Sequence, residues 1–417
     1  MSLVSLSEAR QVANAFVKYE LYNPCGGGPE FVDRAVGALL GQFLLADHVP
    51  LYEFGIFSSS GEAAGSILVP GSRAYPAIVE YSNSGKGLFS ASMKALEKVL
   101  ERGHGVSDKE ISKARLYYHG PFDIVAEFEG RASFSYLRIP NYRFGLSTVA
   151  LPLGLKPTVD MEYPEWRIYL DPQYDLDGFG DGKCYYAKFH KPYRYEQTCR
   201  PSGAAHGNAD QEYCGADACI SGCTPVAWAM LASSFSKYDE FEDMLVDSAH
   251  FRVEWGTNDH WNPADPIVDR IIWDSHGYMG TSCSGNTYGD RRVDAGWLFR
   301  RYGYVCSFGD RPVGAPFFAS VLDGGFTLMG SGRSEWNIGT GDIEGHSFVV
   351  YGYDTRWFAD KLLICMGWGT GYDDRWISAG AVSDLEATYL SSIRLLDDEQ
   401  DIDESRTETY PPFYQRR

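Results

Sequence analysis

The spacing of hydrophobic residues along the first third of the chain indicates a mixture of helices and strands. Apolar residues three and four positions apart predict a helix over 7–20, and Ser5 with Glu8 forms a capping box that begins it. The same spacing predicts a helix over 89–102, and a further amphipathic segment covers about 30–46. Short apolar runs bounded by turn residues predict strands, which lie at 51–57, 66–69, 77–81, 126–128 and 132–137.

Residues 140–165 break this pattern. They contain four prolines and no hydrophobic period, so we predict a linker between two units. The predicted helices beyond it cover 223–237, 267–276, 293–302 and 317–322, and the predicted strands cover 325–330, 346–352, 361–365, 375–377 and 392–396. We therefore predict an α+β protein with a first unit at 1–150, a second at 151–396 and a solvated acidic tail at 397–417.

The composition supports packed units and excludes several classes of protein. The 417 residues are 44% hydrophobic and 15% aromatic, which is enough apolar material for more than one core. The net charge of −19 excludes nucleic acid as an expected partner, because binding to a phosphate backbone needs a basic surface. No apolar run is long enough for a transmembrane segment, and the first residues lack the basic and apolar regions of a signal peptide.

Nine cysteines raise the question of metal sites and disulfides. No pair of cysteines has the Cys-x-x-Cys spacing of a zinc site. The acidic stretch Asp175–Gly182 does not have the spacing of an EF-hand calcium loop, so we predict a solvated turn there. We expect no metal and no organic cofactor. The odd number of cysteines fits four disulfides with one free thiol, and it fits nine reduced thiols equally well.

Cys223 stands where a loop turns into a helix. Pro225 suits the first helical turn, and the apolar residues after it recur at helical spacing. A thiol at a helix N-terminus faces unpaired N–H groups and the positive end of the helix dipole, which favour the nucleophilic thiolate. The stretch alone is also typical of a buried structural cysteine, and a disulfide to Cys214 or Cys219 would silence the thiol.

A cysteine nucleophile needs a base within hydrogen-bond reach, and His346 has the best setting among nine histidines. It follows Gly345 and opens an apolar strand, which places a polar side chain at a strand mouth. A lone histidine in a strand is also typical of a surface or a satisfied core position.

Two further stretches complete the candidate chemistry. The side-chain amide of Gln197 can join the Cys223 backbone N–H as an oxyanion donor, with Gln211 as a rival. Trp368 lies between two glycines on the strand after His346, where it would stand beside the histidine, or the stretch would be only a tight β-turn with its indole in the core.

In this order the four stretches resemble the streptopain-like cysteine peptidases, a branch of the papain-like superfamily. Ser221–Met230 resembles the nucleophile segment of that family, Gly345–Asp354 resembles its Gly-His strand, and Gly367–Gly369 resembles part of its Trp-Gly-Trp-Gly loop. The stretches at 51–56 and 65–85 resemble the strands and turns of the inhibitory propeptide of the same family.

The resemblance implies a secreted or extracytoplasmic zymogen whose substrates are peptides or proteins. A prodomain at 1–150 would dock on a papain-like domain as an intramolecular inhibitor, with the activating cut in 140–165. Cys223 would be the nucleophile and His346 the base. Gln197 would be the oxyanion donor, and Trp368 would pack against the side of the histidine.

One departure from the family leaves other functions open. Cys365 and Met366 stand where the family has Asn and Trp, so the role of orienting the imidazole is unfilled or is met by a backbone carbonyl. A catalytically silent papain-like protein that binds a peptide or partner in the cleft is one alternative. An acyl-transfer or leader-processing enzyme on the same fold is another.

Overall fold

A computed structural model describes most of the 417 residues. These are 2–22, 25, 33–82, 87–101, 107–121, 123–128, 134–139, 143–147, 162–171, 183–186, 195, 199–201, 218–235, 266–283, 285–287, 292, 304–312, 314–334, 345–356, 360–367 and 375–395. We call residues 2–147 the N-terminal unit and residues 162–395 the C-terminal unit. Gln197, Trp368, the Asp175–Gly182 stretch, the predicted helix at 293–302 and the acidic tail lie outside the described residues.

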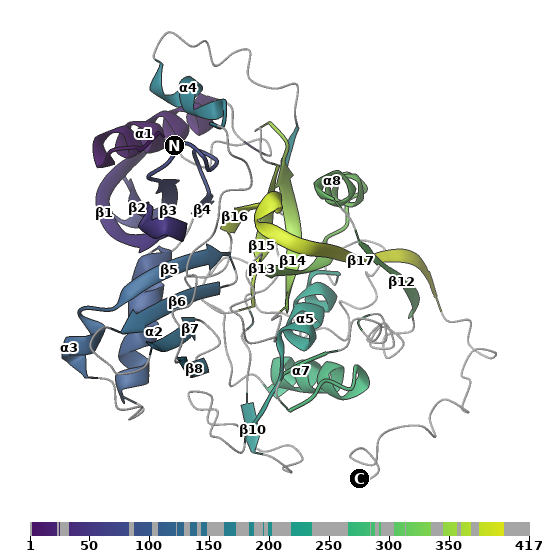
Figure 1. Ribbon diagram of the computed structural model, residues 1–417. Helices are drawn as coiled ribbons and strands as arrows, with labels where there is room; N and C mark the ends of the chain where they lie inside the picture. The colour runs from purple at the N-terminus through teal and green to yellow at the C-terminus, as the bar shows by residue number, and fades with distance from the viewer. Residues whose placement is uncertain are drawn as a thin grey trace.

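The structure is mixed α/β, with a large sheet and several helices, and is compatible with the predicted α+β class (Figure 1). The described helices are α1 (Leu6–Tyr22), α2 (Leu88–Glu101), α3 (Asp108–Ile111), α4 (Glu165–Leu170), α5 (Cys223–Phe235), α7 (Pro266–Tyr278) and α8 (Ala315–Asp323). The strands of the N-terminal unit are β1 (Arg34–Leu44), β2 (Pro50–Ser58), β3 (Ala63–Pro70), β4 (Glu80–Ser82), β5 (Arg115–Gly120), β6 (Asp123–Phe128), β7 (Phe134–Ile139) and β8 (Arg143–Ser147). Those of the C-terminal unit are β9 (Cys184–Tyr186), β10 (Cys199–Pro201), β11 (Ala218–Ile220), β12 (Tyr304–Pro312), β13 (Leu328–Ser334), β14 (Gly345–Asp354), β15 (Lys361–Cys365), β16 (Arg375–Ser378) and β17 (Val382–Leu395).

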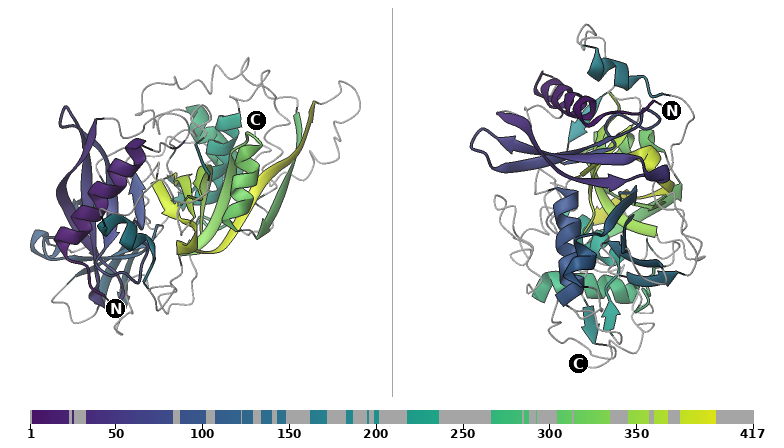
Figure 2. Two further views of the ribbon diagram at one scale, coloured as in Figure 1. Left: turned by 90° about the horizontal axis from the view of Figure 1, so that it is seen from above. Right: turned by 60° about the vertical axis from the view of Figure 1, so that its left-hand side comes forward.

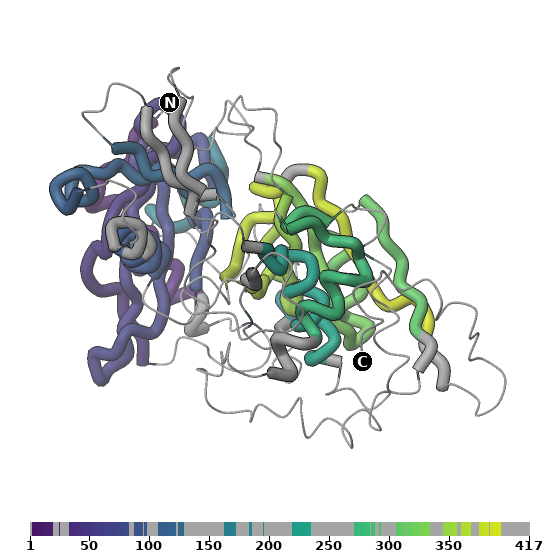
Figure 3. The backbone as a smooth tube through the Cα atoms, turned by 90° about the horizontal axis from the view of Figure 1, so that it is seen from below, coloured from purple at the N-terminus to yellow at the C-terminus, as the bar shows by residue number. Residues whose placement is uncertain are grey.

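One sheet of 15 strands runs through both units. Its order is β12-β17-β13-β14-β15-β16-β4-β3-β2-β1-β5-β6-β7-β8, and β9 pairs with β14 outside this path. The strand β4 therefore joins the two units, with β3 on one side and β16 on the other. Figures 2 and 3 show the purple and blue N-terminal unit beside the green and yellow C-terminal unit.

Helices cover both faces of the sheet. In the N-terminal unit α1 packs on β1, β2 and β3, and α2 packs on β1. In the C-terminal unit α5 packs on β13 and β14, α8 contacts the same two strands, and α7 packs on α5. The six residues from Val226 to Leu231 in α5 are all buried, which is expected of a helix enclosed between a sheet and another helix.

Most helices predicted from hydrophobic spacing are confirmed. The capping box before α1 is present, because the Glu8 N–H donates to Ser5 Oγ at 3.2 Å and the Ser5 N–H donates to Glu8 Oε2 at 2.9 Å. The amphipathic segment at 30–46 is a strand, β1, because it pairs along its length with β2. The predicted linker is partly regular, since β8 pairs with β7 there.

No helix among the described residues is long and apolar enough to span a membrane.

Candidate functional site

The loop before Cys223 is held tightly on both sides. Cys219 forms a disulfide with Cys283, and the Ile220 N–H donates to the Cys283 carbonyl at 2.9 Å. Gly222 has φ of +84°, and a Cβ there would lie 2.5 Å from the Gly285 carbonyl oxygen. Only glycine fits this approach, so the turn into α5 is fixed by backbone packing.

Cys223 itself is a free thiol at the first residue of α5. A disulfide with Cys219, which would have silenced it, is excluded because Cys219 pairs with Cys283. The other free cysteines among the described residues are Cys306, on β12, and Cys365, at the end of β15.

The environment of the sulfur favours a neutral thiol. Burial raises the pKa of Cys223, and this effect outweighs hydrogen bonds from the Ser347 backbone, the Thr224 hydroxyl and the N–H groups at the start of α5. Burial therefore opposes the thiolate that the helix N-terminus favours. Cys223 is only half-buried as a residue, so some contact with water limits the size of this shift.

His346 lies near the start of β14, as predicted, and is only 6% exposed. Its Nε2 lies 2.9 Å from the backbone carbonyl oxygen of Met366, just beyond the end of β15. Burial lowers the pKa of His346 to about 3, although the hydrogen bond to the Met366 carbonyl opposes that shift. The ring is therefore neutral over the physiological range.

Three buried hydroxyl groups tie the start of α5 to the sheet. Thr224 Oγ1 lies 2.9 Å from Ser347 Oγ, and Ser347 Oγ lies 2.9 Å from Ser331 Oγ on β13. The chain of hydroxyls joins the residue after Cys223 to the residue after His346. We call Thr224, Ser347 and Ser331 the hydroxyl chain, which went unnoticed in the sequence because single Ser and Thr residues carry no pattern.

Cys223 begins α5, and His346 lies near the start of β14, the strand on which α5 packs. The Cys223 sulfur has hydrogen bonds with the Ser347 backbone, the Thr224 hydroxyl and the N–H groups of Cys223 and Thr224. On β14 the side chain of Ser347 contacts α5. His346 and Phe348 alternate with Ser347 along the strand and so share its other face, where their rings stack with centroids 6.4 Å apart.

The other two predicted stretches approach the same helix. The Tyr195 hydroxyl lies 2.8 Å from Ser233 Oγ on α5, which brings the chain two residues before Gln197 against that helix. Gly367, with φ of +70°, passes so close to α5 that a Cβ would lie 2.8 Å from Val226 Cγ1. All four sequence stretches therefore lead to α5, while Gln197 and Trp368 lie outside the described residues.

A second histidine lies at this site, and sequence analysis missed it. His276, in the last turn of α7, has Nδ1 3.0 Å from the Ser221 carbonyl oxygen and Nε2 3.9 Å from the Cys219 sulfur. Its ring braces the loop that precedes Cys223. In the sequence, His276 ends the predicted helix 267–276, and although Gly277 follows it, it opens no apolar strand that would have distinguished it.

Comparisons with known proteins found similarity only at the level of solved structures. No protein-family model matches the sequence, and no curated protein matches it. Among solved structures, the active wild-type interpain A cysteine protease of Prevotella intermedia is similar to this chain at 13% identity and a TM-score of 0.29. The likeness covers 49% of this chain and 95% of the protease.

A metal centre has no support among the described residues, where no group of three or more His, Cys, Asp or Glu side chains is placed to hold an ion. The chemistry available at the site is that of a thiol, an imidazole and the N–H groups of a helix start. These are the groups of nucleophilic acyl transfer.

Proposed function

We propose that this protein is a cysteine endopeptidase in which Cys223 is the nucleophile and His346 is the base, on a papain-like C-terminal unit. The observation that carries the proposal is the free thiol at the first residue of α5, hydrogen bonded to the backbone of Ser347 directly beside His346. A free cysteine kept apart from a neighbouring disulfide, at a helix N-terminus, has the setting of a nucleophile.

The reaction would follow the usual steps of thiol catalysis. As Cys223 attacks the scissile carbonyl, its proton passes to the imidazole, and His346 then returns that proton to the leaving amine. The oxyanion would lie between the Cys223 N–H and Gln197, with Trp368 beside the histidine. Water then hydrolyses the thioester, which restores the thiol.

The His346 tautomer fits this role. A carbonyl oxygen only accepts, so Nε2 carries the proton that is donated to Met366, and Nδ1 of the neutral ring is the nitrogen that can accept a proton. The backbone carbonyl of Met366 supplies the orientation that an asparagine side chain gives in the family that the sequence resembles.

Turnover of an unstructured protein substrate tests the proposal. We expect Cys223→Ala to abolish cleavage, and Cys306→Ser, which changes another half-buried thiol, to leave it unchanged. Undiminished cleavage by Cys223→Ala would refute the assignment.

A silent papain-like protein that binds a peptide is the second candidate, and one observation favours it. Burial raises the pKa of Cys223 and lowers that of His346, which moves both values away from those of a thiolate–imidazolium pair. Binding of a peptide by both the wild type and Cys223→Ala, with no cleavage by either, would support this function instead.

We also propose that the protein works outside the cytoplasm. The disulfides Cys25–Cys184 and Cys219–Cys283 are compatible with that setting, because such bonds persist in oxidising compartments. Fewer than two disulfides in protein purified under non-reducing conditions would count against it.

A further inference from the structure

The two units share a sheet rather than merely touching. Strand β4 pairs antiparallel with β16, with Tyr81 opposite Trp376 and Glu80 opposite Ile377. The Tyr81 and Trp376 rings stack at 5.7 Å between centroids. Both rings belong to a continuous hydrophobic core that also contains Phe16 of α1 and Trp228 of α5. Removing the N-terminal unit would therefore open a sheet edge and expose a core.

Buried charges fix the register of this junction. Arg375 on β16 is only 1% exposed and forms an ion pair with Glu80, whose other oxygen accepts from the Tyr118 hydroxyl at 2.7 Å. Burial lowers the pKa of Arg375 to about 10, and the nearby Glu53 carboxylate opposes this shift. Glu53 also accepts from the Leu88 and Phe89 N–H groups at 2.6 Å each, at the start of α2. A cation from one unit is thus enclosed by carboxylates of the other.

A second set of contacts grips the segment just before β4. Lys361 of β15 is buried and donates to the Ile78 carbonyl at 2.8 Å. Glu165 at the start of α4 accepts from the Ala77 N–H and interacts with the Lys361 charge. The Trp166 indole N–H donates to the Tyr75 carbonyl at 2.8 Å. Helix α4 follows the predicted cut region, yet it is packed on the N-terminal unit.

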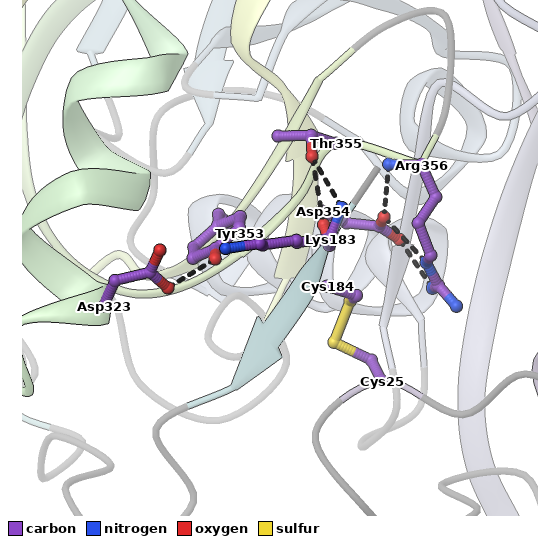
Figure 4. Close-up of a disulfide and its surroundings, with 8 residues drawn as sticks. All are labelled: Cys25, Lys183, Cys184, Asp323, Tyr353, Asp354, Thr355 and Arg356. Atoms are coloured by element: carbon purple, nitrogen blue, oxygen red, sulfur yellow. Dashed lines mark hydrogen bonds and ion pairs between the residues drawn. A yellow bond between two sulfur atoms is a disulfide. The ribbon is translucent and has the colours of Figure 1, made fainter. Parts of the chain in front are cut away.

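A disulfide spans the same region. Cys25 of the N-terminal unit is bonded to Cys184 on β9, across 159 residues of sequence that include the whole of 140–161 (Figure 4). Beside it Arg356 is bonded to Asp354 at 2.7 Å and lies over the Tyr19 ring of α1 at 5.6 Å. The covalent link and the shared sheet therefore act at separate places.

We propose that the N-terminal unit is a permanent partner of the C-terminal unit and is not released by cleavage. Hydrolysis of a peptide bond between residues 148 and 161 gives two chains that stay joined by Cys25–Cys184 and by the β4–β16 junction. The working form of the protein is then a two-chain molecule. This goes beyond the proposed function and does not require Cys223 to be catalytic. It differs from the release that resemblance to an inhibitory propeptide implies.

The test uses the full chain with a recognition sequence for a site-specific protease inserted between Leu151 and Pro152. After cutting, we expect one full-length band on a non-reducing denaturing gel and two bands on a reducing gel. We then expect the cut protein, treated with a phosphine reductant but no denaturant, to elute in size-exclusion chromatography at the volume of the uncut protein. Two bands on the non-reducing gel, or two separated peaks after reduction, would overturn the proposal.

A pair of variants separates the junction from the disulfide. In the cut and reduced protein, Arg375→Glu places a carboxylate among Glu80 and Glu53, and we expect at least a tenfold larger fraction of separated chains than in the parent. Arg333→Glu changes an exposed arginine that pairs with Asp384, and we expect no increase. Equal separation in both variants would show that the buried charges do not hold the units together. Circular dichroism of the uncut Arg375→Glu protein checks folding. If it does not fold, the cut and reduced parent protein decides alone.

Discussion

The Nε2 atom of His346 lies 2.9 Å from the backbone carbonyl oxygen of Met366. This contact fixes which nitrogen of the neutral ring carries the proton, because a carbonyl oxygen accepts and never donates. Nδ1 is then the basic nitrogen. The contact places the orienting group on the backbone of residue 366, so it survives any substitution of the Met366 side chain that leaves the strand in place.

The resting state predicts an unusual pH dependence of thiol reactivity. Because burial raises the pKa of Cys223 and lowers that of His346 to about 3, no imidazolium is present to stabilise a thiolate between pH 4 and 8. We expect the rate of alkylation of Cys223 by iodoacetamide to rise about tenfold per pH unit through neutral pH. It should level off only above about 8.5, the ordinary thiol pKa.

Mass spectrometry of the alkylated Cys223 peptide between pH 4 and 10 measures this profile, with a small free thiol as reference. A plateau already reached at pH 5 would show a preformed ion pair and contradict the neutral resting state.

The hydroxyl chain predicts a loss of both stability and reactivity when it is broken. Ser347→Ala leaves Thr224 and Ser331 without their shared partner, so we expect the free energy of unfolding to fall by about 1–3 kcal/mol. Urea unfolding measures this loss. Labelling of Cys223 by a peptide electrophile should slow at the same time, because the start of α5 is no longer held to β14.

The matched control is Ser320→Ala on α8, whose hydroxyl donates only to the Phe317 carbonyl at an exposed position. A change within about 0.5 kcal/mol is expected there. An equal loss in both variants would mean that the hydroxyl chain has no special role.

Replacing the glycine in the turn before Cys223 should lower the stability of the protein through packing as well as through backbone conformation. Gly222 and Gly325 both have positive φ, at +84° and +94°, but only Gly222 has a backbone atom, the Gly285 carbonyl oxygen, within 2.5 Å of an added Cβ. Both Gly→Ala variants should therefore be destabilised by about 1–2 kcal/mol of backbone strain, with a further loss for Gly222→Ala.

Thermal unfolding of the two variants measures the difference, since Gly325 has nothing within 4 Å of the added Cβ. Equal melting temperatures would show that the loop relaxes away from Gly285 at no cost. The labelling rate of Cys223 should fall in Gly222→Ala alone.

The parts of the fold that could be predicted are those that follow one hydrophobic period. Helices α1, α2 and α5 were located because their apolar residues repeat every three or four positions, and Ser5 with Glu8 marked the start of the first. Segment 30–46 could not be settled in this way. Its apolar residues fit more than one arrangement, and its pairing with β2 decides for a strand.

Contacts between distant residues left no trace in the sequence. Arg375 and Glu80 are 295 positions apart, and nothing in their neighbours indicates that β4 and β16 belong to one sheet. The same holds for the site. Cys223 and His346 could be chosen from their local sequence settings. The role of the Met366 carbonyl could not, because every residue has a backbone carbonyl and the sequence does not show which one accepts a hydrogen bond. The helix start favours a thiolate, but burial, which raises the pKa of Cys223, depends on the whole fold and has no pattern in the sequence.

The measurement that tests the central claim most directly is the labelling of Cys223 by a peptidyl vinyl sulfone in wild-type protein and in His346→Ala. We expect Cys223 to be modified far faster than Cys306 and Cys365, and the His346→Ala rate to fall about 10²–10⁴-fold, the usual contribution of a general base. His48→Gln, at an exposed position of the N-terminal unit, should leave the rate unchanged. Equal rates for Cys223 in wild type and His346→Ala would contradict a Cys–His nucleophile.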